Sequence, residues 1–219
     1  MRYIDKLPAF TKLVLLLIVF VVGMIIARIG YSSSLRFIYL LWNLFLGWIP
    51  LQLSIYLSRR DGNNWKDWII FLAWLLFFPN ALYIVTDLIH LKGHSNVPIW
   101  YDAVLLFSCA ITGLLMAFAS LYRIEIFLVK KINKAGVNKV IVLVIFLGSF
   151  GVYLGRFLRV NSWDVIVNPF ELLNEIWIRL LYPFKYYRTW VVTLLLTVLF
   201  NLLYFGLKNM PTYAQSLKR

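Results

Sequence analysis

The chain has 219 residues, of which 62% are hydrophobic and only 14% are charged, and its formal net charge is +13. A soluble domain usually carries about 25% charged residues, so the composition excludes an ordinary water-soluble domain and predicts an integral membrane protein. The positive charge does not predict nucleic-acid binding, because the sequence has no basic stripe with interleaved aromatic residues in a soluble segment.

Six apolar runs free of charged residues follow one another along the chain. Their lengths are close to the roughly 20 residues that a helix needs to cross a bilayer, although the first and fifth runs must borrow flanking residues. We therefore expect an all-α, polytopic membrane helix bundle that forms a single integral membrane domain over residues 1–219. The spans are predicted near 9–28, 36–58, 68–90, 101–122, 139–158 and 188–207.

The first run also has the charged start and apolar middle of a signal peptide. The segment RIGYSSS that follows it offers no small-x-small cleavage site, so we expect a membrane anchor that stays attached. At the ends of the first and fifth spans, Arg28 and Arg156 are expected to reach toward lipid head groups. Cys109 is the only cysteine, so no intrachain disulfide can form.

The distribution of Lys and Arg predicts which side of the membrane each loop faces. If all six spans are real, the termini and the loops near 58–68 and 123–139 hold most of the basic residues. Cytoplasmic loops are enriched in Lys and Arg, so both termini of this multi-pass cell-membrane protein are expected in the cytoplasm.

One predicted helix, over residues 169–182, is too short and too charged to cross a bilayer. Asn168 is expected as its N-cap, with Pro169 at the first helical position and Pro183 just beyond its end. Glu175 and Arg179 are spaced for an ion pair on one face. We expect an amphipathic helix on the outer surface, as a lid over a site or as a plain surface element.

The third span carries a polar row near its end. Asn80, Tyr83, Asp87 and His90 fall within about an 80° arc if this segment is a regular α-helix. Lipid would not tolerate such a row, so these side chains are expected to face the interior of the bundle. His94 would extend the row only if the helix continued past Gly93, which is doubtful.

Ionisable residues gather at the predicted outer ends of three spans. The set comprises Asp87, His90, Asp102, Arg156, Arg159 and Asp164. In a purely structural interpretation, the two arginines pair with the acids and tie the helices together, because buried charges need partners. In a functional interpretation, ionisable groups within membrane segments mark a site.

Three segments of the sequence resemble a known family. The stretches FPNALYIVTDLIHL, WYD and GRFLRVNSWDVIVNP are similar to the domain of unknown function 1361 family of predicted bacterial multi-pass membrane proteins, over roughly residues 35–207. The resemblance implies no substrate or cofactor, because the family has no assigned activity. The matching positions include the candidate residues above, together with Pro79, Thr86, Trp100, Tyr101, Gly155, Asn161, Ser162 and Trp163.

Three functional interpretations follow, and the sequence does not decide whether the protein is an enzyme. The first is a membrane-embedded enzyme of the cell envelope, with His90 as a general base or with a bound Mn, Mg or Ca ion. Its candidate catalytic residues are Asp87, His90, Asp102 and Asp164. The candidates to bind an anionic lipid or another phosphate-containing substrate are Asn80, Tyr83, Arg156, Arg159 and Asn161.

The second interpretation is a transporter or lipid-handling protein, because two predicted spans are interrupted by proline and carry polar rows. The third is an accessory subunit of an envelope-assembly complex, in which the charged residues form only structural ion pairs. The lipid bilayer is the one partner that the sequence predicts directly; the cofactor, the metal and the protein partners stay unknown.

Overall fold

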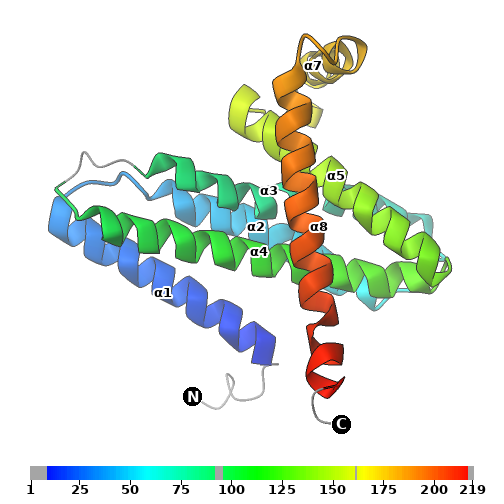
Figure 1. Ribbon diagram of the computed structural model, residues 1–219, viewed down its shortest axis with the longest axis horizontal. Helices are drawn as coiled ribbons and strands as arrows, with labels where there is room; N and C mark the ends of the chain where they lie inside the picture. The colour runs from blue at the N-terminus through cyan, green and yellow to red at the C-terminus, as the bar shows by residue number, and fades with distance from the viewer. Residues whose placement is uncertain (1–8, 92–95, 161, 217–219) are drawn as a thin grey trace. The chain divides into compact units, whose positions relative to one another are not determined.

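The structure, a computed structural model, describes residues 9–91, 96–160 and 162–216 (Figure 1). These residues are mostly helical, and none of them forms a strand. The chain divides into two compact units, Met1–Phe127 and Leu128–Arg219, which we call unit 1 and unit 2. The fold is therefore all-α, as the sequence predicts.

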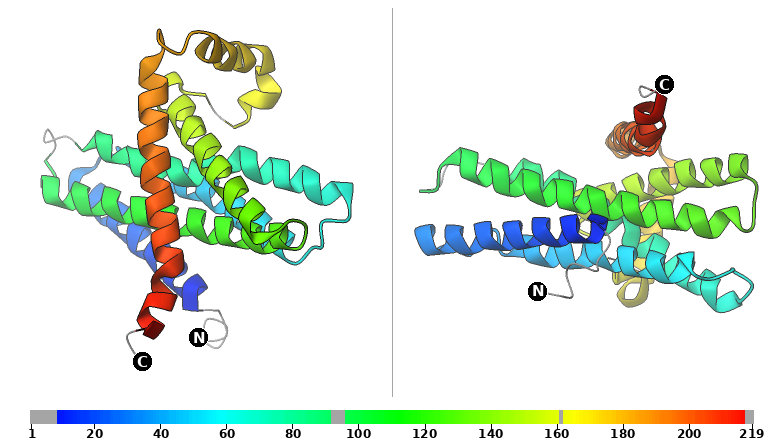
Figure 2. Two further views of the ribbon diagram at one scale, coloured as in Figure 1. Left: turned by 45° about the vertical axis from the view of Figure 1, so that its right-hand side comes forward. Right: turned by 90° about the horizontal axis from the view of Figure 1, so that it is seen from below.

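Unit 1 consists of long helices that run side by side (Figures 1 and 2). They are α1 (Ala9–Ser32), α2 (Tyr39–Ser58), α3 (Trp65–Tyr83) with the 3₁₀ helix η2 (Ile84–His90), and α4 (Ile99–Val129). Its core is apolar, and α1, α2, η2 and α4 all contribute to it, for example through Val21, Leu40, Ile84 and Leu105. Where these apolar side chains would otherwise be exposed to water, their burial stabilises the packing of the helices.

The short link between α2 and α3 is fixed by local hydrogen bonds. The side chain of Asn64 accepts a hydrogen bond from the backbone N–H of Lys66, which caps the start of α3. The Nε of Arg60 donates to Asp67 Oδ1 at 3.2 Å across the same turn. Gly62 adopts a φ of 67°, a left-handed conformation that glycine reaches without strain.

The end of the third span differs from the regular α-helix that the sequence predicts. The α-helix continues through Pro79 but gives way at Ile84 to the 3₁₀ helix, which ends at His90. A 3₁₀ helix turns by about 120° per residue instead of about 100°, so residues three apart align. Asp87 and His90 therefore share a row, whereas the single arc predicted from Asn80 to His90 is wrong.

Helix α3 and helix α4 approach each other closely at Gly113. A Cβ atom at this position would lie 2.8 Å from the carbonyl oxygen of Ala81 and 2.9 Å from Cδ1 of Ile84. At Gly47 on α2, a Cβ would lie 3.2 Å from Cα of Ala81. Two glycines thus let α2 and α4 pack against the same stretch of α3, as small residues do in membrane helix bundles.

Unit 2 consists of two long helices and a short helical segment between them. Its elements are α5 (Lys134–Leu158), α6 (Asp164–Val167), α7 (Pro169–Leu181) and α8 (Tyr187–Ser216). Helix α5 packs against α8, and Phe150 stacks on Trp190 with ring centroids 5.9 Å apart. Helix α7 closely matches the predicted surface helix, and its Glu175–Arg179 ion pair forms. Asn168 stands at the N-cap position, but its side chain makes no capping hydrogen bond.

Six helices of the described chain are long and apolar enough to cross a membrane. They are Ala9–Ser32, Tyr39–Ser58, Trp65–His90, Ile99–Val129, Lys134–Leu158 and Tyr187–Met210. Several of them extend beyond the charge-free runs; α4, for example, continues past Arg123 and Glu125 to Val129. By length and composition, the chain is a multi-pass membrane protein.

Candidate functional site

The predicted candidate residues fall in both units, and within each unit the structure brings some of them together. In unit 1, three candidates, Asp87, His90 and Asp102, each accept a hydrogen bond from a residue that was not predicted as a candidate. We call the six residues of these three contacts the unit 1 polar cluster: Arg28, Arg36, Asn43, Asp87, His90 and Asp102. In unit 2, Arg159 and Asp164 line a pocket beside α7. Asn161 and His94 lie outside the described residues.

An ion pair between α1 and α4 is the strongest interaction of the unit 1 polar cluster. The guanidinium of Arg28 donates to Asp102 twice, from Nε to Oδ1 at 2.7 Å and from Nη2 to Oδ2 at 3.1 Å. Both side chains are only 2% exposed. A two-pronged contact of this kind holds the charges in a fixed geometry as well as neutralising them.

This pair differs in two ways from the expectations from the sequence. Arg28 does not reach toward head groups, because its guanidinium is buried and lies over the ring of Phe37 at 4.6 Å. Asp102 is bound by Arg28, which the structural interpretation did not name as a partner of the acids. The signal was present in the sequence: in the predicted topology, Arg28 and Asp102 lie at the same end of their spans.

The acid of the 3₁₀ helix is held by a neutral partner. Asn43 on α2 donates from Nδ2 to Asp87 Oδ2 at 2.8 Å, and Asp87 is fully buried. This contact joins the second span to the third, and both spans are among those predicted to carry a row of polar residues. Asp87 is therefore at the helix interface, as expected for an acid that lipid would not tolerate.

His90 contacts the first turns of the second span. Its backbone carbonyl accepts a hydrogen bond from Arg36 Nη2 at 3.3 Å, and its ring meets the Tyr39 ring edge-on with centroids 5.9 Å apart. Asn80 and Tyr83 are half-buried, and Asn80 donates from Nδ2 to the carbonyl of Phe77 in its own helix. These polar side chains are thus used mainly in contacts within and between helices.

In unit 2, a pocket of about 250 Å³ lies between the end of α5 and the polar side of α7; we call it the α7 pocket. Its lining residues are Leu158, Arg159, Val160, Asp164, Asn168, Glu171, Leu172 and Glu175. The volume is below the roughly 300–1,000 Å³ of pockets for drug-sized ligands.

Arg159 reaches the α7 pocket because the chain turns sharply at the end of α5. Its backbone is left-handed, with φ 61° and ψ 27°, and its N–H donates to the carbonyl of Leu154. A left-handed residue other than glycine is uncommon, and such strain is concentrated at functional sites. Arg156, the other predicted arginine, lies half-buried in the last turn of α5.

Arg179 anchors the wall of the α7 pocket to α8. It binds Glu175 through both the carboxylate and, at 2.7 Å, the backbone carbonyl. Its guanidinium lies over the ring of Tyr186 at 4.9 Å, and its own carbonyl accepts a hydrogen bond from Trp190 Nε1 at 3.3 Å. The pocket wall is thus held by several contacts at once.

Within the described ranges, no group of three or more His, Cys, Asp or Glu side chains is placed to hold a metal ion. Of the candidate carboxylates in unit 1, Asp102 is bound by Arg28, and Asp87 accepts a hydrogen bond from Asn43. The metal-dependent form of the enzyme interpretation therefore has no ligand set in this part of the chain.

Comparison with known proteins gives one match. A family model described as protein of unknown function (DUF1361) matches residues 42–203, which contain the α7 pocket and all of the unit 1 polar cluster except Arg28 and Arg36. No curated protein and no solved structure matches the chain.

Proposed function

We propose that this chain, which belongs to the DUF1361 family of proteins of unknown function, binds a phosphate-containing lipid head group in the α7 pocket at the outer face of the cell membrane. The observation that carries the proposal is the position of this pocket on the polar side of a helix whose other side is apolar and exposed. The outer placement follows from the positive-inside rule, which predicts cytoplasmic termini.

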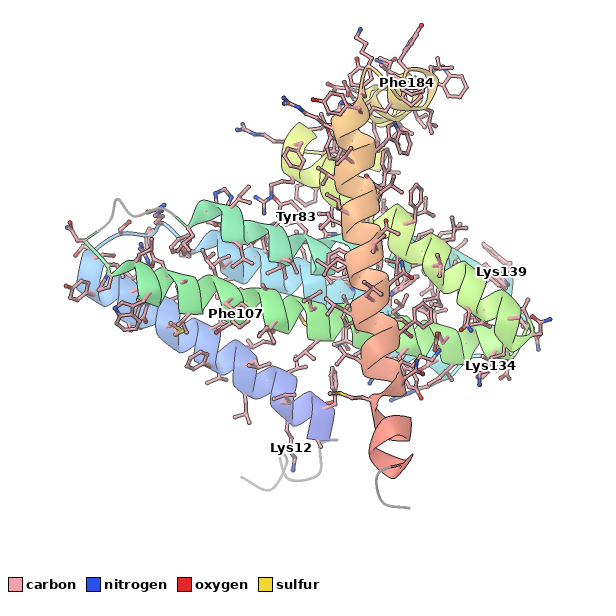
Figure 3. The ribbon with its side chains drawn as sticks, viewed as in Figure 1. Lys12, Tyr83, Phe107, Lys134, Lys139 and Phe184 are labelled. Carbon is pink, nitrogen blue, oxygen red and sulfur yellow. The ribbon has the colours of Figure 1, made fainter. Side chains whose placement is uncertain are left out.

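The two sides of α7 differ sharply in character. Large exposed apolar side chains occupy one side: Phe170, Leu173, Trp177 and Leu180. The residues of α7 that line the pocket lie on the opposite side, since a helix turns by about 100° per residue: Glu171, Leu172 and Glu175. Phe184, just past the helix, is 93% exposed (Figure 3). A helix of this kind lies in the membrane interface with its apolar side in lipid, where head groups are its neighbours.

The charges of the pocket favour a head group that carries both signs. Arg159 offers a guanidinium for a phosphate, a geometry that arginine binds in a two-pronged manner. Asp164, Glu171 and Glu175 are acidic, and Arg179 binds the carboxylate of Glu175. A purely anionic ligand would be repelled by these acids, whereas an ammonium group would be attracted. Phosphoethanolamine has both groups, and a phosphatidylglycerol head group lacks the ammonium.

In this proposal the unit 1 polar cluster stabilises the fold and does not bind the head group, because its charged side chains make contacts between helices. Head-group binding is common to the enzyme and lipid-handling interpretations. An accessory subunit with purely structural ion pairs does not require it.

The test measures lipid binding to the full-length protein purified in detergent. Titration calorimetry with dioctanoyl phosphatidylethanolamine should give saturable binding, and the same experiment with dioctanoyl phosphatidylglycerol should give weaker binding. Soluble glycerophosphoethanolamine shows whether the head group alone is sufficient. Arg159→Gln should weaken binding about tenfold or more, since a hydrogen bond to a charged group contributes about 1.5–3 kcal/mol.

Lys139→Gln is the matched control, because it removes the same charge from an exposed position near the far end of α5 (Figure 3). It should bind the lipid as the natural chain does. If no dioctanoyl lipid binds, or if both substitutions weaken binding equally, the proposal is wrong.

A further inference from the structure

Helix α8 carries a row of polar side chains along one side of a predicted membrane span. Thr189, Thr193, Thr197 and Asn201 follow at intervals of four residues, so they occupy roughly a third of the helix circumference. The opposite side is apolar and exposed, and it includes Leu195, Val198 and Leu202. The helix is therefore amphipathic within a segment long and apolar enough to cross the bilayer.

Several polar atoms of this row are buried without a hydrogen-bond partner. Thr189 and Thr193 are 0% exposed, and among the described residues their Oγ1 atoms have no partner. Asn201 donates from Nδ2 to the carbonyl of Thr197, but its Oδ1 is likewise buried without a partner in this part of the chain. Buried polar groups are nearly always satisfied by protein or by ordered water, so these atoms call for a ligand.

The first residue of the row, Thr189, precedes Trp190, which is linked to the α7 pocket through Arg179. Arg179, which binds the pocket residue Glu175, is 5% exposed, and its Nε has no partner within the described chain. Its carbonyl is bound by Trp190, which lies next to Thr189. Along α5, which packs against α8, Asn138 also buries an Oδ1 that has no hydrogen-bond partner among the described residues.

Valine has nearly the same shape as threonine and would fill a dry helix interface without leaving a hydroxyl unsatisfied. Threonine at two fully buried positions is therefore unfavourable unless something polar binds it. In membrane proteins, polar groups within a span face either a partner or a water-filled cavity. Water is small enough to enter between packed helices and can both donate and accept hydrogen bonds.

We propose that the seam along the polar row of α8 holds a file of water molecules bound by Thr189, Thr193 and Asn201. This file forms a polar track that starts beside the α7 pocket and continues into the membrane span. It gives the chain a route along which a polar or charged group can enter the bilayer, which is the property that a lipid-handling protein needs. The track does not depend on which head group the pocket binds.

The test uses single cysteines in the full-length protein with Cys109→Ala as background, reconstituted in lipid vesicles. The probe is 2-(trimethylammonium)ethyl methanethiosulfonate, a charged reagent that attacks only thiolates reached by water. Thr189→Cys and Thr193→Cys should react on the order of tenfold faster than Leu195→Cys, because thiolates do not form in an apolar environment. With dry packing, the two threonine positions should react no faster than Leu195→Cys, because all three thiols then lie in an apolar environment.

Equal or slower reaction at both threonine positions than at Leu195 overturns the proposal. Thr193→Val supplies an independent readout in the natural Cys109 background. A hydrated seam predicts that this substitution leaves the melting temperature unchanged or lowers it, because a bound water molecule loses its hydrogen bond to the Thr193 hydroxyl. A rise in melting temperature means that the hydroxyl was unsatisfied, and this result also overturns the proposal.

Discussion

Arg28 and Asp102 place a full charge on each of two apolar helices, and each charge is tolerated because the other is present. Removing one partner of a buried ion pair leaves an uncompensated charge, and this costs more than the intact pair contributes. The pair of Arg60 and Asp67 offers a contrast, because its arginine side chain is 45% exposed. Water can replace a lost partner there but not at Arg28.

We expect Arg28→Gln and Asp102→Asn each to destabilise the protein by about 3–5 kcal/mol. The double substitution should cost much less than the sum of the two, because neither charge then remains buried alone. The measurement is thermal unfolding in detergent, followed by the loss of helical circular dichroism.

Asp67→Asn is the matched substitution at this second pair and should cost much less than Asp102→Asn, because the arginine that remains is 45% exposed and water can reach it. Strict additivity of the Arg28 and Asp102 substitutions would show that the two charges do not interact in the folded protein.

At the scale of helices, close backbone approach decides which substitutions the packing of unit 1 can accept. Gly113 faces the carbonyl oxygen of Ala81, a backbone atom that cannot move aside as a flexible side chain could. At Gly23 on α1, a Cβ atom would meet nothing within 4 Å. The two positions therefore separate the effect of packing from the effect of helix propensity.

Gly113→Ala should destabilise the protein by about 1–3 kcal/mol, the usual cost of overpacking. Gly23→Ala should be neutral or stabilising by up to about 1 kcal/mol, because alanine favours the helix more than glycine does. Both are measured by the midpoint of thermal unfolding in the same detergent. A neutral Gly113→Ala variant would mean that α3 and α4 are further apart than the structure places them.

The elements could be predicted from the sequence to very different degrees. Long apolar runs predicted the long helices, and the prolines at 169 and 183 predicted the bounds of α7. Both signals are local, because desolvation and proline geometry act locally. Helix ends were less predictable: α4 continues past Arg123 because a charged residue at a span end can reach water without ending the helix. The change to a 3₁₀ helix at Ile84 has no local signal, so the predicted polar arc was wrong there.

The site was harder to predict than the helices. The predicted topology places Arg28 at the same membrane side as Asp102, but it places Arg156 and Arg159 there too, so it does not decide which cation binds Asp102. The α7 pocket depends on the left-handed backbone of Arg159, a conformation that sequence favours mainly for glycine. The sequence did identify Arg159 and Asp164 as candidates, and these two residues do line one pocket.

At the scale of the whole molecule, the alternation of the six helices determines which loops share a side of the membrane. If all six cross, the link between α2 and α3 lies on the same side as both termini, and the link after α7 lies on the other side. The positive-inside rule assigns the first of these sides to the cytoplasm. The two exposed positions Asn63 and Phe184 report on the two sides.

In whole cells that carry the Cys109→Ala background, a membrane-impermeant maleimide should label Phe184→Cys. Asn63→Cys should be labelled only after the cells are permeabilised. Labelling of both positions in intact cells would mean that one of the six helices does not cross. The reverse pattern would invert the orientation and move the α7 pocket to the cytoplasmic face.

The partners Arg28 and Asp102 are 74 positions apart in the chain, so the ribosome makes one well before the other. Because translation proceeds at about 5–20 residues per second, Asp102 is synthesised roughly 4–15 seconds after Arg28. During this interval α1 sits in the translocon or the lipid with an unneutralised guanidinium. The charge that Arg28 places on α1 is therefore neutralised by Asp102 only after the start of α4 has been synthesised.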